Sequence, residues 1–201
     1  MIIPLNQLRK YRVRITGVIH IGAHFGEELR TYKREGIKHI AFIEPCKSSY
    51  EVLQRNTRNT NCKLFKVALG SSFGEGEMKT ASHNLGQSNS LLKPETHLKQ
   101  HPEVVFDGVE KVSIVTLDSL NFSNEYNMIN MDVQGYELEV LKGGLETLKH
   151  IDIIYTEVNR EEVYSGCAKI EEIDAFLNEF ERVKTEWCGG WGDAVYIRKK
   201  Q

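Results

Sequence analysis

The chain alternates short apolar runs with amphipathic stretches, and this alternation predicts a parallel α/β sheet. The first run, residues 17–21, is rich in β-branched residues and too short for a helix, and Gly22 ends it. Apolar residues then recur at helical spacing between Gly26 and Gly36, where a glycine closes the stretch. The pattern therefore predicts a strand, a glycine turn and a helix within residues 17–36.

The same unit repeats immediately downstream. A second strand is predicted over residues 38–43 and a helix over about 49–59, with Ser48 or Ser49 as its cap. A third strand is predicted over residues 62–69. Two strand–helix units followed by a strand favour a parallel sheet with right-handed crossovers.

Regular order is interrupted between residues 70 and 125. Short strands are expected there at 77–80 and 111–117, the latter alternating like an edge strand. A connection of this length without an obvious helix is too long for a simple loop. Because 201 residues are typical of one compact domain, we expect a single domain over 1–201, with an irregular elaboration at about 70–125 over the ligand end of the sheet.

The pattern resumes with two further strand–helix units and a closing pair of strands. The predicted elements are strands at 128–131 and 151–158, helices at 138–148 and 170–180, and strands at 182–187 and 194–198. Gly143 and Gly144 weaken the middle of the first of these helices. Because a short glycine-rich loop joins the last two strands, they predict a hairpin whose final strand is antiparallel to the others.

An acid and a glycine turn are predicted to meet at one edge of this sheet. Glu44 follows the second strand, and Gly22 and Gly26 follow the first. A carboxylate there can accept hydrogen bonds from both hydroxyls of a ribose, and the glycine turn lets a ligand approach the backbone closely. A side chain at Gly22 is then expected to block the ligand rather than unfold the chain. The alternative is that the glycines only permit a tight turn in an ordinary connection.

Two features of the sequence distinguish between the common nucleotide-binding folds that it could adopt. An NAD-binding domain prefers a glycine two positions after the first one, where this chain has His24. The terminal hairpin and the spacing of Gly22 and Gly26 instead resemble the Rossmann-like fold of methyltransferases that use S-adenosyl-L-methionine (SAM). An NAD-dependent oxidoreductase and a SAM-binding module without catalysis are the alternative functions.

Five motifs resemble, in order, those of the FkbM family of SAM-dependent methyltransferases. They are residues 19–26 (IHIGAHFG), 43–45 (IEP), 87–92 (QSNSLL), 115–120 (VTLDSL) and 131–137 (MDVQGYE). The resemblance implies a mostly parallel seven-stranded α/β sheet with an antiparallel C-terminal strand. It also implies an enzyme that uses SAM to methylate a hydroxyl of a sugar, polyketide or similar small molecule.

This resemblance and the predicted strand ends give two sets of site residues. The expected cofactor-binding residues are His20, Gly22, Ala23, His24, Gly26, Glu44, Val67, Ala68, Ser88 and Ser90, and the expected catalytic residues are Asp132 and Glu157. The glycine turn would meet the methionine part of SAM, while Val67 and Ala68 would either wall the adenine or belong to the core. Ser88 and Ser90 are hydrogen-bonding candidates for cofactor or acceptor.

Three of these residues carry open questions. Asp132, at the end of the fourth strand, is a general base for an acceptor hydroxyl, a contact to the SAM ammonium, or a helix cap. His20 stands where the family commonly has an acid that helps to hold the cofactor's amino acid moiety, and a neutral imidazole still accepts one hydrogen bond. Glu157 ends the fifth strand and is expected at the same rim as Asp132.

Composition and charge limit the classes of binding partner that we expect for this protein. The net charge is −2 and no long basic run occurs, so nucleic acid is not an expected partner. The family resemblance implies a small-molecule acceptor instead, such as a saccharide. The four cysteines lack a close pair and metal-ligand spacing, so we expect reduced thiols in a cytoplasmic protein and no metal site. Residues 1–14 lack the apolar core of a signal peptide, and no transmembrane span is expected.

Overall fold

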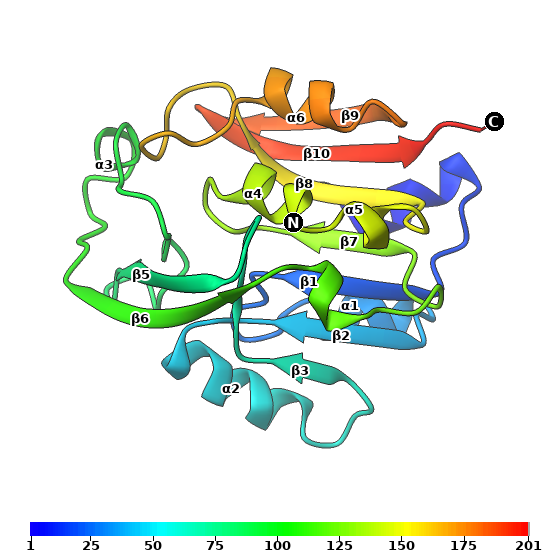
Figure 1. Cartoon of the computed structure of the whole chain (residues 1–201), viewed down its shortest axis with the longest axis horizontal. Helices are drawn as coiled ribbons and strands as arrows, with labels where there is room; N and C mark the ends of the chain where they lie inside the picture. The colour runs from blue at the N-terminus through cyan, green and yellow to red at the C-terminus, as the bar shows by residue number, and fades with distance from the viewer. Residues whose placement is uncertain (201) are drawn as a thin grey trace.

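The computed structural model describes residues 1–200, which form a seven-stranded sheet with helices on both faces (Figure 1). The strand order is β3-β2-β1-β7-β8-β10-β9. The strands are β1 (Gly17–Ile21), β2 (His39–Ile43), β3 (Lys63–Phe65), β7 (Met128–Met131), β8 (Ile153–Asn159), β9 (Phe180–Cys188) and β10 (Trp191–Arg198). Strands β1, β2, β3, β7 and β8 are parallel, whereas β10 is antiparallel to both of its neighbours. The predicted fold class is therefore confirmed.

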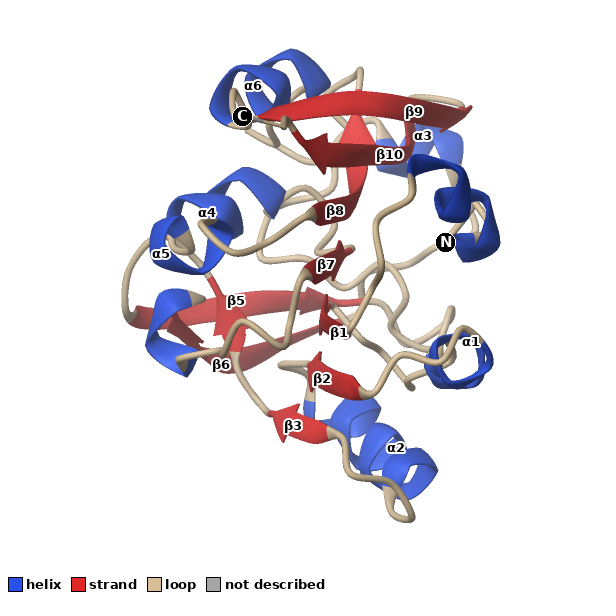
Figure 2. Cartoon of the chain, turned by 90° about the vertical axis from the view of Figure 1, so that its right-hand side faces the viewer, coloured by secondary structure: helices blue, strands red, loops and turns tan. Residues whose placement is uncertain are grey.

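The helices divide between the two faces of the sheet (Figure 2). The 3₁₀-helix η1 (Leu5–Tyr11), α1 (Leu29–Arg34) and α2 (Lys47–Thr57) lie on one face, and α4 (Glu137–Lys142), α5 (Leu145–Leu148) and α6 (Ile170–Phe176) lie on the other. Each face has its own apolar cluster. Successive β1 residues alternate between these clusters, as the pleat of a strand requires.

The predicted third strand is divided between two sheets. Residues 63–65 form β3 beside β2, whereas β4 (Ala68–Leu69) leaves the main sheet. It joins a three-stranded sheet of order β4-β6-β5, with β5 (Gly74–Thr80) and β6 (Gly108–Val115). Strand β6 is thus the central strand of this small sheet rather than an edge strand, because alternation reports a half-buried face and not the number of partners.

Other predicted boundaries also shift. Helix α2 begins after Cys46, two residues earlier than expected, so Ser48 and Ser49 lie inside it and do not cap it. The 138–148 stretch forms two helices, because Gly143 packs against the backbone of Gly70 too closely for a side chain. The 70–125 segment contains a short helix α3 (His97–Gln100) and a 3₁₀ turn η2 (Asp118–Leu120), which the sequence pattern did not indicate.

Candidate functional site

A cavity of about 720 Å³ lies where the parallel strands end, within the usual size range of small-molecule sites. Ten of the twelve predicted site residues border it: His20, Gly22, Ala23, His24, Glu44, Val67, Ala68, Ser88, Asp132 and Glu157. Gly26 and Ser90 are not among its lining residues. The carboxyl ends of neighbouring parallel strands thus meet at one site, as in other open α/β sheets.

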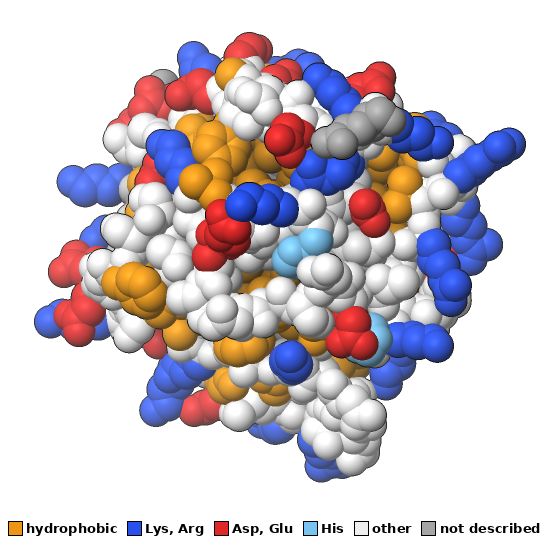
Figure 3. Space-filling model, turned by 45° about the vertical axis from the view of Figure 1, so that its right-hand side comes forward, with side chains coloured by type: hydrophobic (Ala, Val, Ile, Leu, Met, Phe, Trp, Pro, Cys, Tyr) orange, Lys and Arg blue, Asp and Glu red, His pale blue; other side chains and the backbone are white. Residues whose placement is uncertain are grey.

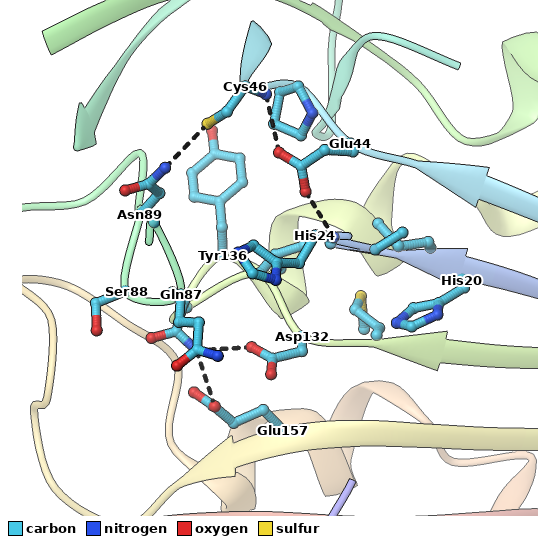
Figure 4. Close-up of a pocket in the computed structure, with 18 of the residues that line it drawn as sticks. His20, His24, Glu44, Cys46, Gln87, Ser88, Asn89, Asp132, Tyr136 and Glu157 are labelled. Carbon is cyan, nitrogen blue, oxygen red and sulfur yellow. Dashed lines mark hydrogen bonds between the residues drawn. The ribbon is translucent and has the colours of Figure 1, made fainter. Parts of the chain in front are cut away.

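Glu44 ends β2 and is held by backbone groups (Figure 4). Its Oε2 accepts a hydrogen bond from the His24 N–H and its Oε1 from the Cys46 N–H, both at 2.9 Å. Burial raises the pKa of Glu44 to about 7, although these two N–H groups oppose the increase. Each carboxylate oxygen has a second lone pair, so both remain able to accept a ligand's hydroxyl.

The two glycines of the turn serve the fold directly. Both have positive φ, +78° at Gly22 and +77° at Gly26. A Cβ at Gly22 would lie 1.8 Å from the Asp132 carbonyl oxygen, and one at Gly26 would lie 2.7 Å from a methyl carbon of Leu53 on α2. The expectation that a side chain at Gly22 would only obstruct a ligand is therefore wrong, since it would collide with the backbone after β7 first. Gly26 packs against α2 instead of facing the cavity.

His20 is buried in β1 and hydrogen-bonded on the α1 side of the sheet. The Asn130 side-chain amide donates to the Tyr32 hydroxyl at 2.6 Å, and that hydroxyl donates to His20 Nδ1 at 3.2 Å. The ring proton then belongs on Nε2. Burial lowers the pKa of His20, although Glu28 opposes the decrease, so the imidazole is neutral near pH 7.

His24 links the glycine turn to the 81–91 loop. Its Nδ1 lies 2.7 Å from a Glu27 carboxylate oxygen, and its Nε2 lies 2.9 Å from the Leu85 carbonyl oxygen. Both partners only accept hydrogen bonds, so the doubly protonated ring satisfies both. Burial alone would lower the pKa of His24, but the hydrogen bonds to Glu27 and Leu85 raise it overall.

Asp132 and Glu157 are brought together by Gln134, a residue that the sequence analysis missed. The Gln134 amide nitrogen donates to Asp132 Oδ1 at 2.6 Å and to Glu157 Oε2 at 3.0 Å. Its Oε1 accepts a hydrogen bond from the Tyr164 hydroxyl at 2.5 Å. Gln134 has a φ of +54°, in the left-handed region, and its side chain bridges the residues at the ends of β7 and β8. This amide holds the two carboxyl groups at one point of the cavity.

The two acids differ in how readily they ionise. Burial and then the nearby Asp132 carboxylate raise the pKa of Glu157 well above its ordinary value. Burial also raises the pKa of Asp132, but the Gln134 N–H opposes the increase. The Asp132 side chain is exposed and borders the cavity. The pKa of Glu157 is therefore raised more strongly than that of Asp132, so Asp132 is the more readily ionised of the two carboxyl groups.

The turn before α4 is capped by Glu137 and not by Asp132. A Glu137 carboxylate oxygen accepts hydrogen bonds from the backbone N–H groups of Val133 at 3.1 Å and Gly135 at 3.2 Å. Burial raises the pKa of Glu137 to about 7. The side-chain partner of Asp132 is Gln134, so helix capping, one of its three predicted roles, is contradicted.

The two serines have different surroundings. Ser88 borders the cavity, where its Oγ accepts a hydrogen bond from the Asn84 amide at 2.7 Å and lies 3.1 Å from His97 Nε2. Ser90 is fully buried and donates to the Gln134 carbonyl oxygen at 2.7 Å. Ser90 thus stabilises the turn that carries Gln134, and a contact with cofactor or acceptor is not supported.

The described residues hold neither a candidate metal site nor a candidate membrane-spanning helix. Within residues 1–200, no three His, Cys, Asp or Glu side chains are grouped as a metal site would need. Among the helices of the same residues, none has both the length and the apolar composition needed to cross a membrane.

Comparison with known solved structures identifies the fold. A putative methyltransferase yhhF from Escherichia coli aligns with 98% of this chain and 84% of its own, with a TM-score of 0.53 and 12% identity. A putative tRNA methyltransferase from Streptococcus pneumoniae, solved in complex with SAM, aligns with 98% of this chain and 72% of its own, with a TM-score of 0.54 and 12% identity. At these identities the likeness shows the methyltransferase fold alone.

Sequence relatives identify the family. The 2-O-methyltransferase NoeI of Sinorhizobium fredii is 30% identical over 203 residues, covering 91% of this chain and 79% of that protein. The methyltransferase FkbM domain matches residues 20–183, which confirms the predicted resemblance and removes the NAD-dependent alternative. The chain therefore belongs to the FkbM family of methyltransferases.

Proposed function

We propose that this methyltransferase transfers the methyl group of SAM to a hydroxyl oxygen of a small molecule, with saccharides as the first acceptors to test. The observation that carries the proposal is a single cavity that joins Glu44 to the Asp132–Gln134–Glu157 group. The relative NoeI, a 2-O-methyltransferase, supports an oxygen acceptor, and the SAM complex of the streptococcal neighbour supports the cofactor.

The residues at the ends of β1 and β2 fit such a cofactor. The Glu44 carboxylate would accept hydrogen bonds from the ribose hydroxyls, and Val67 and Ala68 would border the adenine. The turn at Gly22 to His24 would meet the amino acid part, with His20 as a neutral neighbour. When bound, SAM supplies a methyl group attached to a sulfonium sulfur, which a hydroxyl oxygen can attack directly.

The Asp132 carboxylate would then serve as the general base. As the acceptor oxygen forms its bond to the methyl carbon and the carbon–sulfur bond breaks, Asp132 takes the hydroxyl proton. Proton removal by a positioned base typically contributes about 10²–10⁴-fold to rate. Gln134 fixes the orientation of the Asp132 carboxylate by its hydrogen bond to Oδ1. The rest of the rate would come from aligning the acceptor with the methyl group.

The experiment is a transfer assay with SAM labelled on its methyl group and a panel of uncharged glycosides. We expect label in at least one acceptor, with one S-adenosylhomocysteine formed per methyl transferred. SAM binding without transfer to any hydroxylated acceptor would favour a binding module instead. Absence of SAM binding in calorimetry would overturn the cofactor assignment itself.

We also propose a cytoplasmic location. All four cysteines lie within the described residues, and none forms a disulfide. Free thiols are usual in proteins of reducing compartments. Fractionation of the producing cells is the direct test, with recovery in the secreted fraction as the contrary result.

A further inference from the structure

Positive charge gathers on one face of the sheet, the face that carries η1, α1 and α2. Residues 9–14, 30–38 and 47–58 contain eleven Lys or Arg residues and two acids, although the whole chain has 26 Lys and Arg against 28 Asp and Glu. The helices of the other face differ, because residues 137–149 and 169–179 contain seven acids and three lysines. The net charge is only −2, yet charge is strongly separated across the sheet.

Part of this positive charge meets at the C-terminal end of α1. Arg9 Nη2 lies 2.8 Å from a Glu35 carboxylate oxygen, which places η1 beside the end of α1. The Lys38 N–H donates to the Thr16 carbonyl oxygen at 3.1 Å, so the stretch that follows η1 also lies here. The cations gathered at this end, which we call the α1 basic surface, are Arg9, Arg14, Lys33, Arg34, Lys38 and Arg58.

The cations of the α1 basic surface are exposed and mostly lack an acidic partner. Within residues 1–200, Arg9 is the one member with a carboxylate oxygen within 4 Å. In Figure 3, Lys and Arg side chains follow one another along the right-hand edge of the molecule, the side that carries η1 and α1 in Figure 2. Unpaired cations grouped in this way attract an anionic partner.

Helix stabilisation does not account for the whole surface. Lys33 and Arg34 lie in the last turn of α1, where the helix dipole favours cations. Arg14 and Lys38, however, lie outside any helix. Lys33 and Lys38 also border a second cavity, of about 300 Å³, together with residues of the 59–62 loop. A small anionic group could enter this cavity between the two ammonium groups.

Exposed aliphatic side chains lie at the other end of α1. Met1 and Ile2 are each 41% exposed, and the Met1 nitrogen lies 3.9 Å from a carboxylate oxygen of Glu28, the residue before α1. Helix α1 has six residues and is thus about 9 Å long. Cations beside exposed aliphatic side chains suit an anionic bilayer, because the cations attract the headgroups and the apolar side chains enter the interface.

The same surface is less suited to nucleic acid. Proteins that bind single strands stack the bases on exposed aromatic rings. Tyr32 of α1 is fully buried, and Tyr11 of η1 is half-buried with its hydroxyl bonded to the Val183 carbonyl oxygen. The Lys10 ammonium lies 4.8 Å from the centre of the Tyr11 ring and occupies one of its faces. Stacking on either ring is therefore blocked.

We propose that the α1 basic surface docks this protein onto an anionic lipid bilayer. The docking surface lies outside the residues assigned to methyl transfer and needs no SAM, so it stands or fails separately from the proposed function. Because Met1 and Ile2 also border the large cavity, docking would bring that cavity close to the membrane surface.

The test is co-sedimentation of the whole protein with vesicles of phosphatidylcholine alone or of equal parts phosphatidylcholine and phosphatidylglycerol. We expect binding to the anionic vesicles only, with an affinity that falls as salt is raised, because salt screens the attraction. Titration with a duplex oligonucleotide measures the competing class of partner. No binding to anionic vesicles, equal binding to both kinds of vesicle, or tighter binding to the duplex would overturn the proposal.

Two matched variants locate the binding surface. Lys33→Gln combined with Lys38→Gln should lower the affinity for anionic vesicles at least ~10-fold, since each cation near a bilayer contributes several-fold. Lys93→Gln combined with Lys111→Gln removes the same charge from exposed residues of the 70–125 segment and should change the affinity less than ~2-fold. Thermal unfolding checks that both variants are folded. Equal losses in the two variants would contradict docking through the α1 basic surface.

Discussion

At the scale of single residues, Glu44 is the group on which SAM binding depends most in the proposed function. It was predicted from its place after the second strand, and both of its oxygens are held by backbone N–H groups at 2.9 Å. Those bonds orient the carboxylate before any ligand arrives, which reduces the entropy cost of binding.

We expect Glu44→Ala to weaken SAM binding by about 1.5–3 kcal/mol, the usual worth of hydrogen bonds to a charged group. Calorimetry measures the affinity, and circular dichroism checks that the fold persists. Glu51→Ala, at an exposed acid on α2, is the matched control. Because the pKa of Glu44 is about 7, affinity should fall as the pH drops through that value. Unchanged SAM affinity in a folded Glu44→Ala protein would contradict the assignment.

His24 gives a second prediction at this scale. Its pKa is raised in the folded protein, so the stabilisation of the 81–91 loop is fully present below pH 6.5 and is lost as the pH rises through the folded pKa. The loop should therefore open more often at alkaline pH. Its amide protons should then show less protection from hydrogen exchange, after correction for intrinsic exchange rates. His24→Leu should remove that dependence. A wild-type loop whose protection does not vary with pH would rule out this link.

At the scale of elements, the pattern of apolar and polar residues predicts the ends of strands well, but it predicts the conformation of turns poorly. Glu44 and Asp132 follow strands whose apolar character is plain in the sequence, so their meeting could be predicted from parallel topology. The position of the Gln134 side chain could not be predicted in this way, because the sequence does not indicate the positive φ of this residue. The helix break at Gly143 and Gly144, by contrast, lies where these two glycines weaken the helix in the sequence, and only the packing of Gly143 against the backbone of Gly70 was not predictable.

The contact between β1 and the turn after β7 gives a prediction for Gly22. Gly22→Ala should destabilise strongly, because its Cβ would lie 1.8 Å from the Asp132 carbonyl oxygen. Gly36→Ala is a matched control, with a similar φ of +75° and nothing within 4 Å of the added Cβ. The control should cost only about 1–2 kcal/mol, the usual penalty of the left-handed region. Equal losses in thermal unfolding would show that the close contact is unimportant.

The turn before α4 gives a prediction for Gln134. Gln134→Met keeps the length of the side chain but removes the N–H that favours ionised Asp132. The pKa of Asp132 should rise, so the acidic limb of the pH–rate profile should move to higher pH while SAM affinity stays nearly constant. A lower rate with no displacement of that limb would indicate a structural role only.

At the scale of the whole molecule, one cavity connects both halves of the sheet. Glu44 and the glycine turn follow β2 and β1, the acid pair comes from the ends of β7 and β8, and β10 adds Trp191 and Asp193. In the proposed function, the ends of β1 and β2 form the cofactor side. The parallel sheet and its antiparallel terminal strand were predictable from the repeated strand–helix units and the terminal hairpin, whereas the order of the strands was not predicted. The structure of residues 70–125 was predictable only as an irregular elaboration, because its second sheet depends on pairings between distant segments.

The central claim is that this cavity performs methyl transfer with Asp132 as the base, and Asp132→Asn tests it most directly. The amide keeps the size of the side chain and loses the proton acceptor. Calorimetry and single-turnover transfer from labelled SAM should be measured on the same preparation. The account predicts nearly normal SAM affinity and a transfer rate at least ~10²-fold lower. Loss of SAM binding would assign Asp132 to the cofactor's ammonium, and an unchanged rate would contradict the account.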